Sequence, residues 1–244
     1  SGTLKGIGRG RHFCQNDAHL FVTPEQIKDE VTKVVHLIFD TYKDFGITNY
    51  RCVLSLRDPA NKEKYHDDDE MWNTAEGALR DIMDSLGLEY TEEIGEAAFY
   101  GPKLDVNVQP AVGNEITLST CQLDFCLPAK FNLYYIDKDG EKKTPVVLHR
   151  AILGSLDRFM AYILEETKGN LPTWLAPVQT RVMPVKTDDE ALNAYAKEVY
   201  DTLMENDIRV ELDDRAEKLG YRMRDGQIQK VPYLLVIGMN EKDN

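Results

Sequence analysis

The order in which strands and helices are expected changes near Pro172, and this change constrains the folds open to the 244-residue chain more than any other feature. Before Pro172, strand signals dominate residues 99–135, where Gly-Pro and Gly-Asn turns separate them. Helical patterns, with apolar residues every three or four positions, stand apart from these strands at 24–45 and 70–86. The first is expected to begin with a capping box of Thr23 and Gln26, and residues 137–141 are expected to form a hairpin turn. Strands joined by turns pair antiparallel, so residues 1–171 are expected to form an antiparallel sheet with flanking helices, an α+β arrangement.

After Pro172, strand and helix patterns alternate along the chain. The alternating elements are a strand at 180–185, a helix at 188–205, a strand at 208–212, a helix at 215–229 and a strand at 233–238. Parallel neighbours need a crossover, and a helix supplies one. This βαβαβ order therefore predicts a small α/β domain with a mostly parallel sheet over 172–244.

Composition and charge narrow the classes of protein to be considered. No stretch approaches the about 20 apolar residues of a membrane-spanning helix, so no membrane partner is expected. The four cysteines form no CxxC pair, which favours free thiols in a reducing cytoplasm. A net charge of −13 argues against non-specific nucleic-acid binding, but a specific RNA can still meet a local basic patch.

Residues 9–19 gather two cations, an aromatic ring, a carboxylate and two imidazoles. Arg9 can pair with phosphate oxygens, Phe13 can stack on a nucleobase, and Asp17 can hold an ammonium group. The alternative is a solvated basic loop in which Phe13 turns toward the core. The spacing alone leaves both interpretations open.

A second segment combines a histidine with an arginine in apolar surroundings. An apolar strand at 145–148 runs into His149, and a helix is expected from there to about residue 167, with Gly154 one turn inside it. Arg158 would then lie within an apolar helix, where a guanidinium needs an anion or a carboxylate. It marks either a ligand site or an internal ion pair at a helix edge.

Polar side chains also interrupt the strand-rich region. Tyr100 and Lys103 flank a Gly-Pro turn, which either presents them for function or is simply a turn. Thr120 and Gln122 share one face of a predicted strand, while Cys121 and its apolar neighbours share the other. A polar sheet face indicates a pocket or contact with water.

His19 and His149 both lie beside predicted strands, although 130 positions separate them. Two neutral imidazoles can bind zinc, but structural histidines are commoner. If they form a metal pair, their coordinating nitrogens should approach within about 3–3.5 Å, because metal–nitrogen bonds are about 2.0–2.1 Å long.

Taken together and in this order, these segments resemble threonyl-tRNA synthetases, which are class II aminoacyl-tRNA synthetases. Arg9, Phe13 and Asp17 have the spacing of the second half of motif 2, and the segment LGSLDR ending at Arg158 resembles motif 3. More narrowly similar segments follow in family order over nearly the whole chain: QNDAHLF, GEAAFYGPK, CQLDF, HRAILGS and PTWLAPVQ.

The resemblance implies a role for each matching residue of the first domain. Arg9 and Arg158 would contact the phosphates of ATP, Phe13 would stack on adenine, and Lys103 would lie near the transferring carboxyl and phosphate. Magnesium would accompany the ATP. The residues implied for the threonine pocket are Gln15, Asp17, Tyr100, Thr120 and Gln122.

The resemblance also implies a zinc ion with three protein ligands. His19 and His149 would be two of them, and the third, a cysteine, would precede the first residue of this chain. Motif 1, the first arginine of motif 2 and the last strand and helix of the family are not matched either. We therefore expect a piece truncated at both ends that does not ligate by itself, drawn from an enzyme that is a homodimer.

In the second domain, the resemblance implies that Lys230 and Glu241 meet anticodon bases of threonine tRNA. Arg222 and Arg224 are expected to extend this RNA face into a local basic patch. The main alternative to a ligase is a non-catalytic paralogue or fragment that binds RNA or ATP. A zinc hydrolase is a weaker alternative, because no HExxH or other close ligand pair is present.

Overall fold

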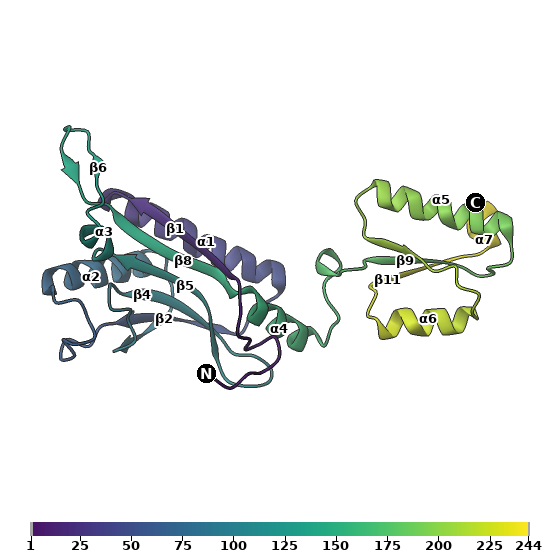
Figure 1. The fold of residues 1–244 in the computed structure, drawn as a ribbon, viewed down its shortest axis with the longest axis horizontal. Helices are drawn as coiled ribbons and strands as arrows, with labels where there is room; N and C mark the ends of the chain where they lie inside the picture. The colour runs from purple at the N-terminus through teal and green to yellow at the C-terminus, as the bar shows by residue number, and fades with distance from the viewer. Residues whose placement is uncertain (1, 244) are drawn as a thin grey trace. The chain divides into compact units, whose positions relative to one another are not determined.

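The computed structural model describes residues 2–243, which form two compact units that divide between Tyr162 and Ile163. The N-terminal unit is built on a six-stranded sheet in the order β1-β8-β5-β4-β2-β3 (Figure 1). Its strands are β1 (Gln15–Val22), β2 (Tyr50–Leu56), β3 (Tyr90–Ile94), β4 (Lys103–Val108), β5 (Ile116–Asp124) and β8 (Val146–Ser155). Neighbours pair antiparallel except β2 and β3, which are parallel because α2 (Asp69–Ser85) crosses over between them. The predicted antiparallel sheet is confirmed.

One face of this sheet is covered by helices. After the short η1 (Pro24–Gln26), which begins with the predicted Thr23 capping box, α1 (Ile27–Phe45) packs on β5 and β8, and α2 packs on β2. The helix α1 ends at Gly46, whose left-handed φ of 69° suits glycine. Cys121 and Leu123 point to this side and are fully buried, whereas Thr120 and Gln122 on the other side are half-buried. The predicted polar face of β5 is thus open.

Shorter elements complete the N-terminal unit. They are α3 (Leu127–Lys130), the hairpin of β6 (Tyr135–Ile136) and β7 (Lys142–Lys143), and the first part of α4 (Leu156–Thr167), a helix that continues past the boundary at Tyr162. The hairpin turn predicted at 137–141 lies between β6 and β7 as expected.

The strand β8 corrects the prediction that a helix follows His149 directly. It continues to Ser155 because it is held between β1 on one side and β5 on the other, and this main-chain pairing outweighs the helix propensity of Arg150-Ala-Ile-Leu. Gly154 therefore lies in a strand, with a left-handed φ of 62°, and a Cβ there would lie 3.0 Å from the Leu118 carbonyl oxygen. A bulge next to it is satisfied by Asn16, whose Oδ1 accepts from the amides of Ile152 and Leu153 at 3.2 and 3.3 Å.

The C-terminal unit has the predicted parallel sheet, in the order β10-β9-β11. Its elements are η2 (Thr173–Leu175), β9 (Thr180–Pro184), α5 (Glu190–Glu205), β10 (Val210–Leu212), α6 (Leu219–Ile228), β11 (Tyr233–Ile237) and α7 (Met239–Asp243). Figure 1 shows α5 and α6 on opposite faces of this sheet. The apolar core between α5 and the sheet includes Val182, Leu192, Ala196 and Ile237.

None of the helices within residues 2–243 combines the length and the apolarity that crossing a bilayer requires.

Candidate functional site

A row of side chains crosses four strands on the open face of the larger sheet. His19 on β1 lies opposite His149 on β8, His149 lies opposite Gln122 on β5, and Gln122 lies opposite Lys103 on β4. Because side chains directly opposite in a sheet point to the same face, the backbone register alone brings these four residues together. One step along the strands, Asp17, Ala151 and Thr120 form a second row.

Two adjacent pockets open above these rows. The first, here called the histidine pocket, is lined by Asp17, His19, Tyr100, Gln122 and His149. The second, here called the arginine pocket, is lined by Arg9, Phe13 and Arg158 together with Gly154 and Asp157. Gln15, Thr120 and Ala151 line both, so the two pockets meet at these residues.

In the histidine pocket, polar side chains are held in place by one another. The Tyr100 hydroxyl donates to Oε1 of Gln122. Burial raises the pKa of the Tyr100 phenol, and the carboxylates of Asp124 and Asp17 raise it further, so the phenol stays a neutral donor. The Oγ1 of Thr120, which lines the pocket, is buried without a hydrogen-bond partner. Unpaired buried polar atoms beside a pocket are groups that a polar ligand can satisfy.

Lys103 lies in the row but does not line either pocket. Its ammonium is 2.8 Å from Oδ2 of Asp105, which also accepts from the Ser55 hydroxyl at 2.9 Å. The turn that carries Tyr100 toward Gln122 depends on Gly101, since a Cβ there would overlap the carbonyl oxygen of Leu123. Tyr100 and Lys103 are therefore presented from a rigid turn.

The arginine pocket brings together residues that lie about 145 positions apart in the chain. Phe13 is 56% exposed, which rules out the alternative of a core-facing ring. Arg158 lies exposed in the first turn of α4, not within an apolar helix as predicted, and its Nε donates to the Gly8 carbonyl at 3.4 Å. The Asp157 carboxylate accepts from the Cys14 amide at 3.0 Å and so ties the Phe13 loop to the start of α4.

The two histidines lie next to each other across β1 and β8. Their ring centroids are 4.7 Å apart, with the rings edge to face. Nε2 of His149 lies 2.8 Å from Oδ2 of the fully buried Asp124. Within residues 2–243, no group of three or more histidine, cysteine and acidic side chains is arranged to hold a metal ion. The two imidazoles can therefore supply two ligands of a metal site and not a complete one.

In the C-terminal unit, the structure separates the predicted RNA-facing residues. Lys230 is exposed directly after α6, in a left-handed conformation with φ of 60°. Glu241 lies in the first turn of α7, and its Oε2 accepts from the Gly238 amide at 2.8 Å. Arg224 is exposed, but Arg222 is fully buried, so the prediction that Arg222 lies on the RNA face is wrong.

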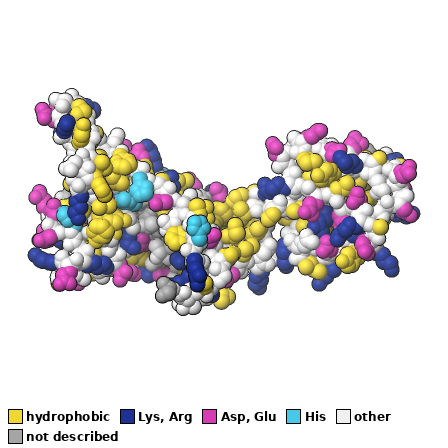
Figure 2. Space-filling view, viewed as in Figure 1, with side chains coloured by type: hydrophobic (Ala, Val, Ile, Leu, Met, Phe, Trp, Pro, Cys, Tyr) yellow, Lys and Arg dark blue, Asp and Glu magenta, His cyan; other side chains and the backbone are white. Residues whose placement is uncertain are grey.

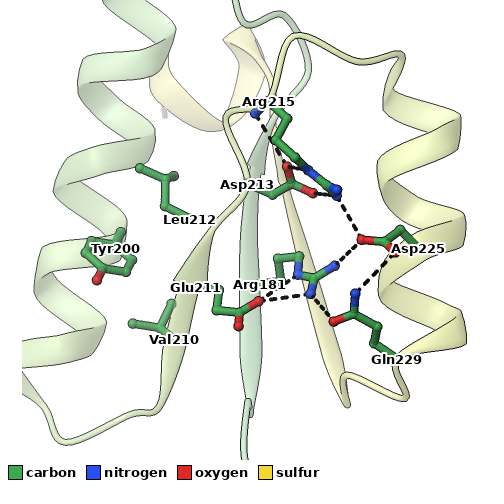
Figure 3. A pocket seen from close by; sticks show the side chains of 9 residues that line it. All are labelled: Arg181, Tyr200, Val210, Glu211, Leu212, Asp213, Arg215, Asp225 and Gln229. Atoms are coloured by element: carbon green, nitrogen blue, oxygen red, sulfur yellow. Dashed lines mark hydrogen bonds and ion pairs between the residues drawn. The ribbon is translucent and has the colours of Figure 1, made fainter.

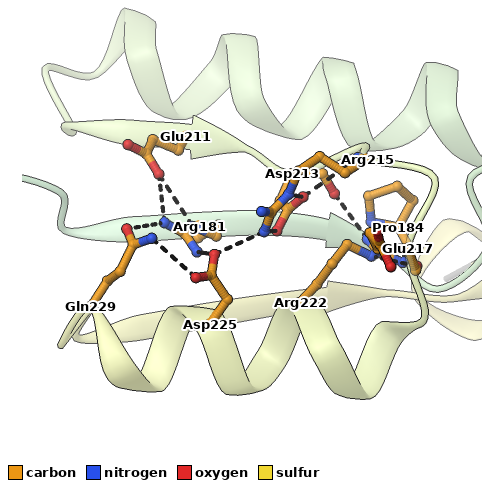
Figure 4. Close-up of polar contacts among 9 residues, drawn as sticks. All are labelled: Arg181, Pro184, Glu211, Asp213, Arg215, Glu217, Arg222, Asp225 and Gln229. Atoms are coloured by element: carbon orange, nitrogen blue, oxygen red, sulfur yellow. Dashed lines mark hydrogen bonds and ion pairs between the residues drawn. The ribbon is translucent and has the colours of Figure 1, made fainter.

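The buried guanidinium of Arg222 lies among four backbone carbonyls. It donates to the carbonyl oxygens of Glu217, Asp213 and Pro184 at 3.1, 2.9 and 2.8 Å (Figure 4), and to that of Val185 at 3.4 Å. Arg224 lies two residues later in the chain, so the helical repeat directs it to a different side of α6.

Sequence reasoning missed a second buried arginine. Arg181 on β9 donates to Glu211, Asp225 and Gln229 at 2.8 to 3.2 Å, and these side chains line the pocket shown in Figure 3. The signal was one arginine in an otherwise apolar strand. Its donors are engaged within the chain, so the network ties the last turns of α6 to the sheet. Figure 2 shows acidic and basic side chains interspersed on the visible face of this unit.

Each of the two units contains residues that match a known protein family. Residues 1–167 match the tRNA synthetase class II core domain (G, H, P, S and T), and residues 179–244 match the anticodon binding domain. The threonine–tRNA ligase of Staphylococcus saprophyticus is 55% identical over 244 residues, which are 100% of this chain and 38% of that protein. The threonine–tRNA ligase of Geobacillus kaustophilus is 56% identical over 241 residues, 99% of this chain and 37% of the relative.

A solved structure extends the similarity to three dimensions. The RNA binding domain of threonyl-tRNA synthetase from Cryptosporidium parvum superposes with a TM-score of 0.88 at 39% identity, covering 98% of this chain and 58% of that one. The chain spans less than two fifths of the length of the two curated relatives described above. It belongs to the class II tRNA synthetases, whose core domain residues 1–167 match.

Proposed function

We propose that the protein of which this chain is part is a threonine–tRNA ligase, which activates threonine with ATP and transfers it to threonine tRNA. The observation that carries the proposal is the pair of pockets that meet at Gln15 and Thr120. One is basic and aromatic, and the other is polar with two imidazoles. A nucleotide in the first and an amino acid in the second would place a carboxylate against an α-phosphate at the shared wall.

The arginine pocket fits ATP. Arg9 and Arg158 would contact the phosphates, with magnesium neutralising further charge, and the exposed ring of Phe13 would stack on adenine. Arginines held before the reaction stabilise the charge that develops at phosphorus without reorganising. Lys103 would reach the transferring carboxyl and phosphate if its ammonium leaves Asp105, a step that a bound anion would favour.

The histidine pocket fits threonine. Asp17 would hold the ammonium group, while Tyr100, Gln122 and Thr120 would line the remaining wall. His19 and His149 fit two ligand positions of a zinc ion, since their rings approach edge to face across neighbouring strands. Zinc there would supply a ligand site for the threonine hydroxyl, a group that valine lacks. Pocket shape alone would discriminate poorly between threonine and valine.

The division of labour follows the two domains, whose boundary we place between residues 171 and 172. Residues 172–244 would read the anticodon of threonine tRNA, with contacts from Lys230 and Glu241. In keeping with the resemblance, we further propose that the complete protein is a cytoplasmic homodimer.

The test is threonine-dependent exchange of pyrophosphate into ATP by the complete protein. We expect exchange with threonine and at least about a hundredfold less with valine, because a site built for a hydroxyl rejects its absence strongly. Exchange with another amino acid would refute the assignment of threonine. A protein that binds tRNA but exchanges nothing would instead be the non-catalytic module.

The anticodon proposal is tested by Lys230→Ala. Alanine tolerates the left-handed backbone no worse than lysine, so the change removes the ammonium group without added strain. We expect weaker tRNA charging with unchanged pyrophosphate exchange. Lys197→Ala is the matched control, because this exposed lysine lies on α5 at the other face of the sheet. Equal loss of both activities would show that Lys230 is structural.

A further inference from the structure

Asp124, at the end of β5, is a fully buried carboxylate with no assigned role. Its Oδ1 accepts from the backbone amides of Cys126 and Leu127 at 2.9 and 2.8 Å, at the start of α3. Its Oδ2 lies 2.8 Å from Nε2 of His149. Each oxygen of this buried group is therefore satisfied, and its position is set by the backbone of two elements.

These contacts decide where the proton of His149 resides. Oδ1 already accepts from two backbone amides, and a carboxylate only accepts hydrogen bonds. The short contact at Oδ2 therefore requires that Nε2 of His149 donates. In a neutral imidazole with its proton on Nε2, the lone pair lies on Nδ1.

We propose that Asp124 is a positioning residue that holds His149 as the Nε2–H tautomer, so that Nδ1 is the atom that binds the metal ion. The proposal rests on the proposed zinc site at His19 and His149. Metal-binding histidines usually donate their second nitrogen to a carboxylate or a carbonyl, which fixes the ring and its tautomer. The 4.7 Å separation of the two imidazole rings, directly opposite on β1 and β8, places the fixed ring beside the second ligand.

The sharpest variant is Asp124→Asn in the complete protein. The amide oxygen can still accept from Cys126 and Leu127, which leaves the NH2 group toward His149. An NH2 group only donates, so Nε2 must accept and the proton must move to Nδ1. We expect ¹⁵N shifts of the metal-free protein, labelled at histidine and assigned with His149→Gln, to show this exchange of tautomers. Zinc affinity, measured by competition with a chelator, should fall about tenfold or more.

Asp105→Asn is the matched control. Asp105 is also a buried carboxylate on the same sheet, but it contacts Ser55 and Lys103 and no histidine. It should leave both the His149 tautomer and the zinc affinity as in the wild type. The wild-type tautomer is measured without any Asp124 variant, so the proposal stays testable if Asp124→Asn does not fold.

The outcomes separate this proposal from the proposed function. A wild-type His149 with its proton on Nδ1, or an Asp124→Asn variant with wild-type zinc affinity, would overturn the role of Asp124 alone. A wild-type protein that binds no zinc would refute the zinc site and with it the ligand role of Nδ1. Exchange of the tautomer together with the loss of zinc affinity supports the proposal.

Discussion

Replacing Arg222 by methionine should destabilise the C-terminal unit strongly, although the side chain touches no other charged side chain through its hydrogen bonds. Its guanidinium is fully buried and donates to the carbonyl oxygens of Glu217, Asp213 and Pro184 (Figure 4). These carbonyls belong to the end of β9 and to the segment between β10 and α6. Arg222 therefore ties α6 to the end of β9 and to the segment that follows β10.

The magnitude follows from the three shorter of the four hydrogen bonds, those of 3.1 Å or less. A hydrogen bond from a charged donor contributes about 1.5–3 kcal/mol, so three are worth roughly 4.5–9 kcal/mol before any offset. Methionine fills much of the volume and removes the cost of burying a guanidinium, which is several kcal/mol. Since the carbonyls are left buried and unpaired, we expect a net loss of about 3–5 kcal/mol in the free energy of unfolding.

Native-state hydrogen exchange is the suitable assay, because it reports the free energy of opening of each unit separately. We expect the amides of β9 and α6 to lose protection in Arg222→Met while those of β5 and β8 keep it. Arg224→Met is the matched control, since Arg224 is exposed on the same helix and an exposed substitution changes stability by about 0.5 kcal/mol or less. Protection within about 1 kcal/mol of wild type in Arg222→Met would refute the reasoning.

Three further predictions concern the N-terminal unit. In Gly101→Ala, the new Cβ would overlap the Leu123 carbonyl and displace Tyr100 from Gln122, so pyrophosphate exchange by the complete protein should fall about a hundredfold. Gly77→Ala is the control, because a Cβ there lies in open space on α2 and should leave exchange unchanged. Equal loss of exchange in both variants would contradict the steric argument. Of the four cysteines, only the exposed Cys14 should react quickly with iodoacetamide at pH 8, because burial raises the pKa of Cys121 to about 12 and also raises the pKa values of Cys52 and Cys126. Rapid labelling of Cys121 in the native protein would contradict the buried geometry. Unfolding returns the three buried thiols to a pKa of about 8.5, so their contribution to stability is complete below that pH and falls as pH rises toward 12. Urea titrations at pH 7 and pH 10 can measure this loss of stability.

The sequence predicted the architecture well where local pattern and tertiary packing agree. The capping box at Thr23 and the crossover order after Pro172 both appear in the structure, since each depends on residues close together in the chain. It failed after His149, where Arg150-Ala-Ile-Leu favours a helix locally but lies between two strands. Only the position of β8 in the sheet, a long-range property, decides that competition.

The arginines show a second limit. Arg222 and Arg224 are the same residue type, two positions apart on one helix, and a count of basic residues treats them alike. Their fates differ because a helix turns by about 100° per residue, which directs one side chain at the carbonyls of β9 and the other at solvent. Sequence can identify a basic segment, but not which of its members is free to meet an anion.

The candidate site depends on strand register more than on any local motif. His19, His149, Gln122 and Lys103 come from four strands, and they meet only because each is directly opposite the next. A shift of one residue would turn a whole strand's contribution to the buried face. That shift is opposed by the apolar alternation of β5 and by the bulge beside Gly154, whose free amides are taken up by Asn16. Residues that line neither pocket, such as Asn16 and the apolar residues on the buried face of β5, thus determine whether the pockets form. A list of polar residues therefore indicates the chemistry, but only the pairing of the strands shows which of these residues lie together.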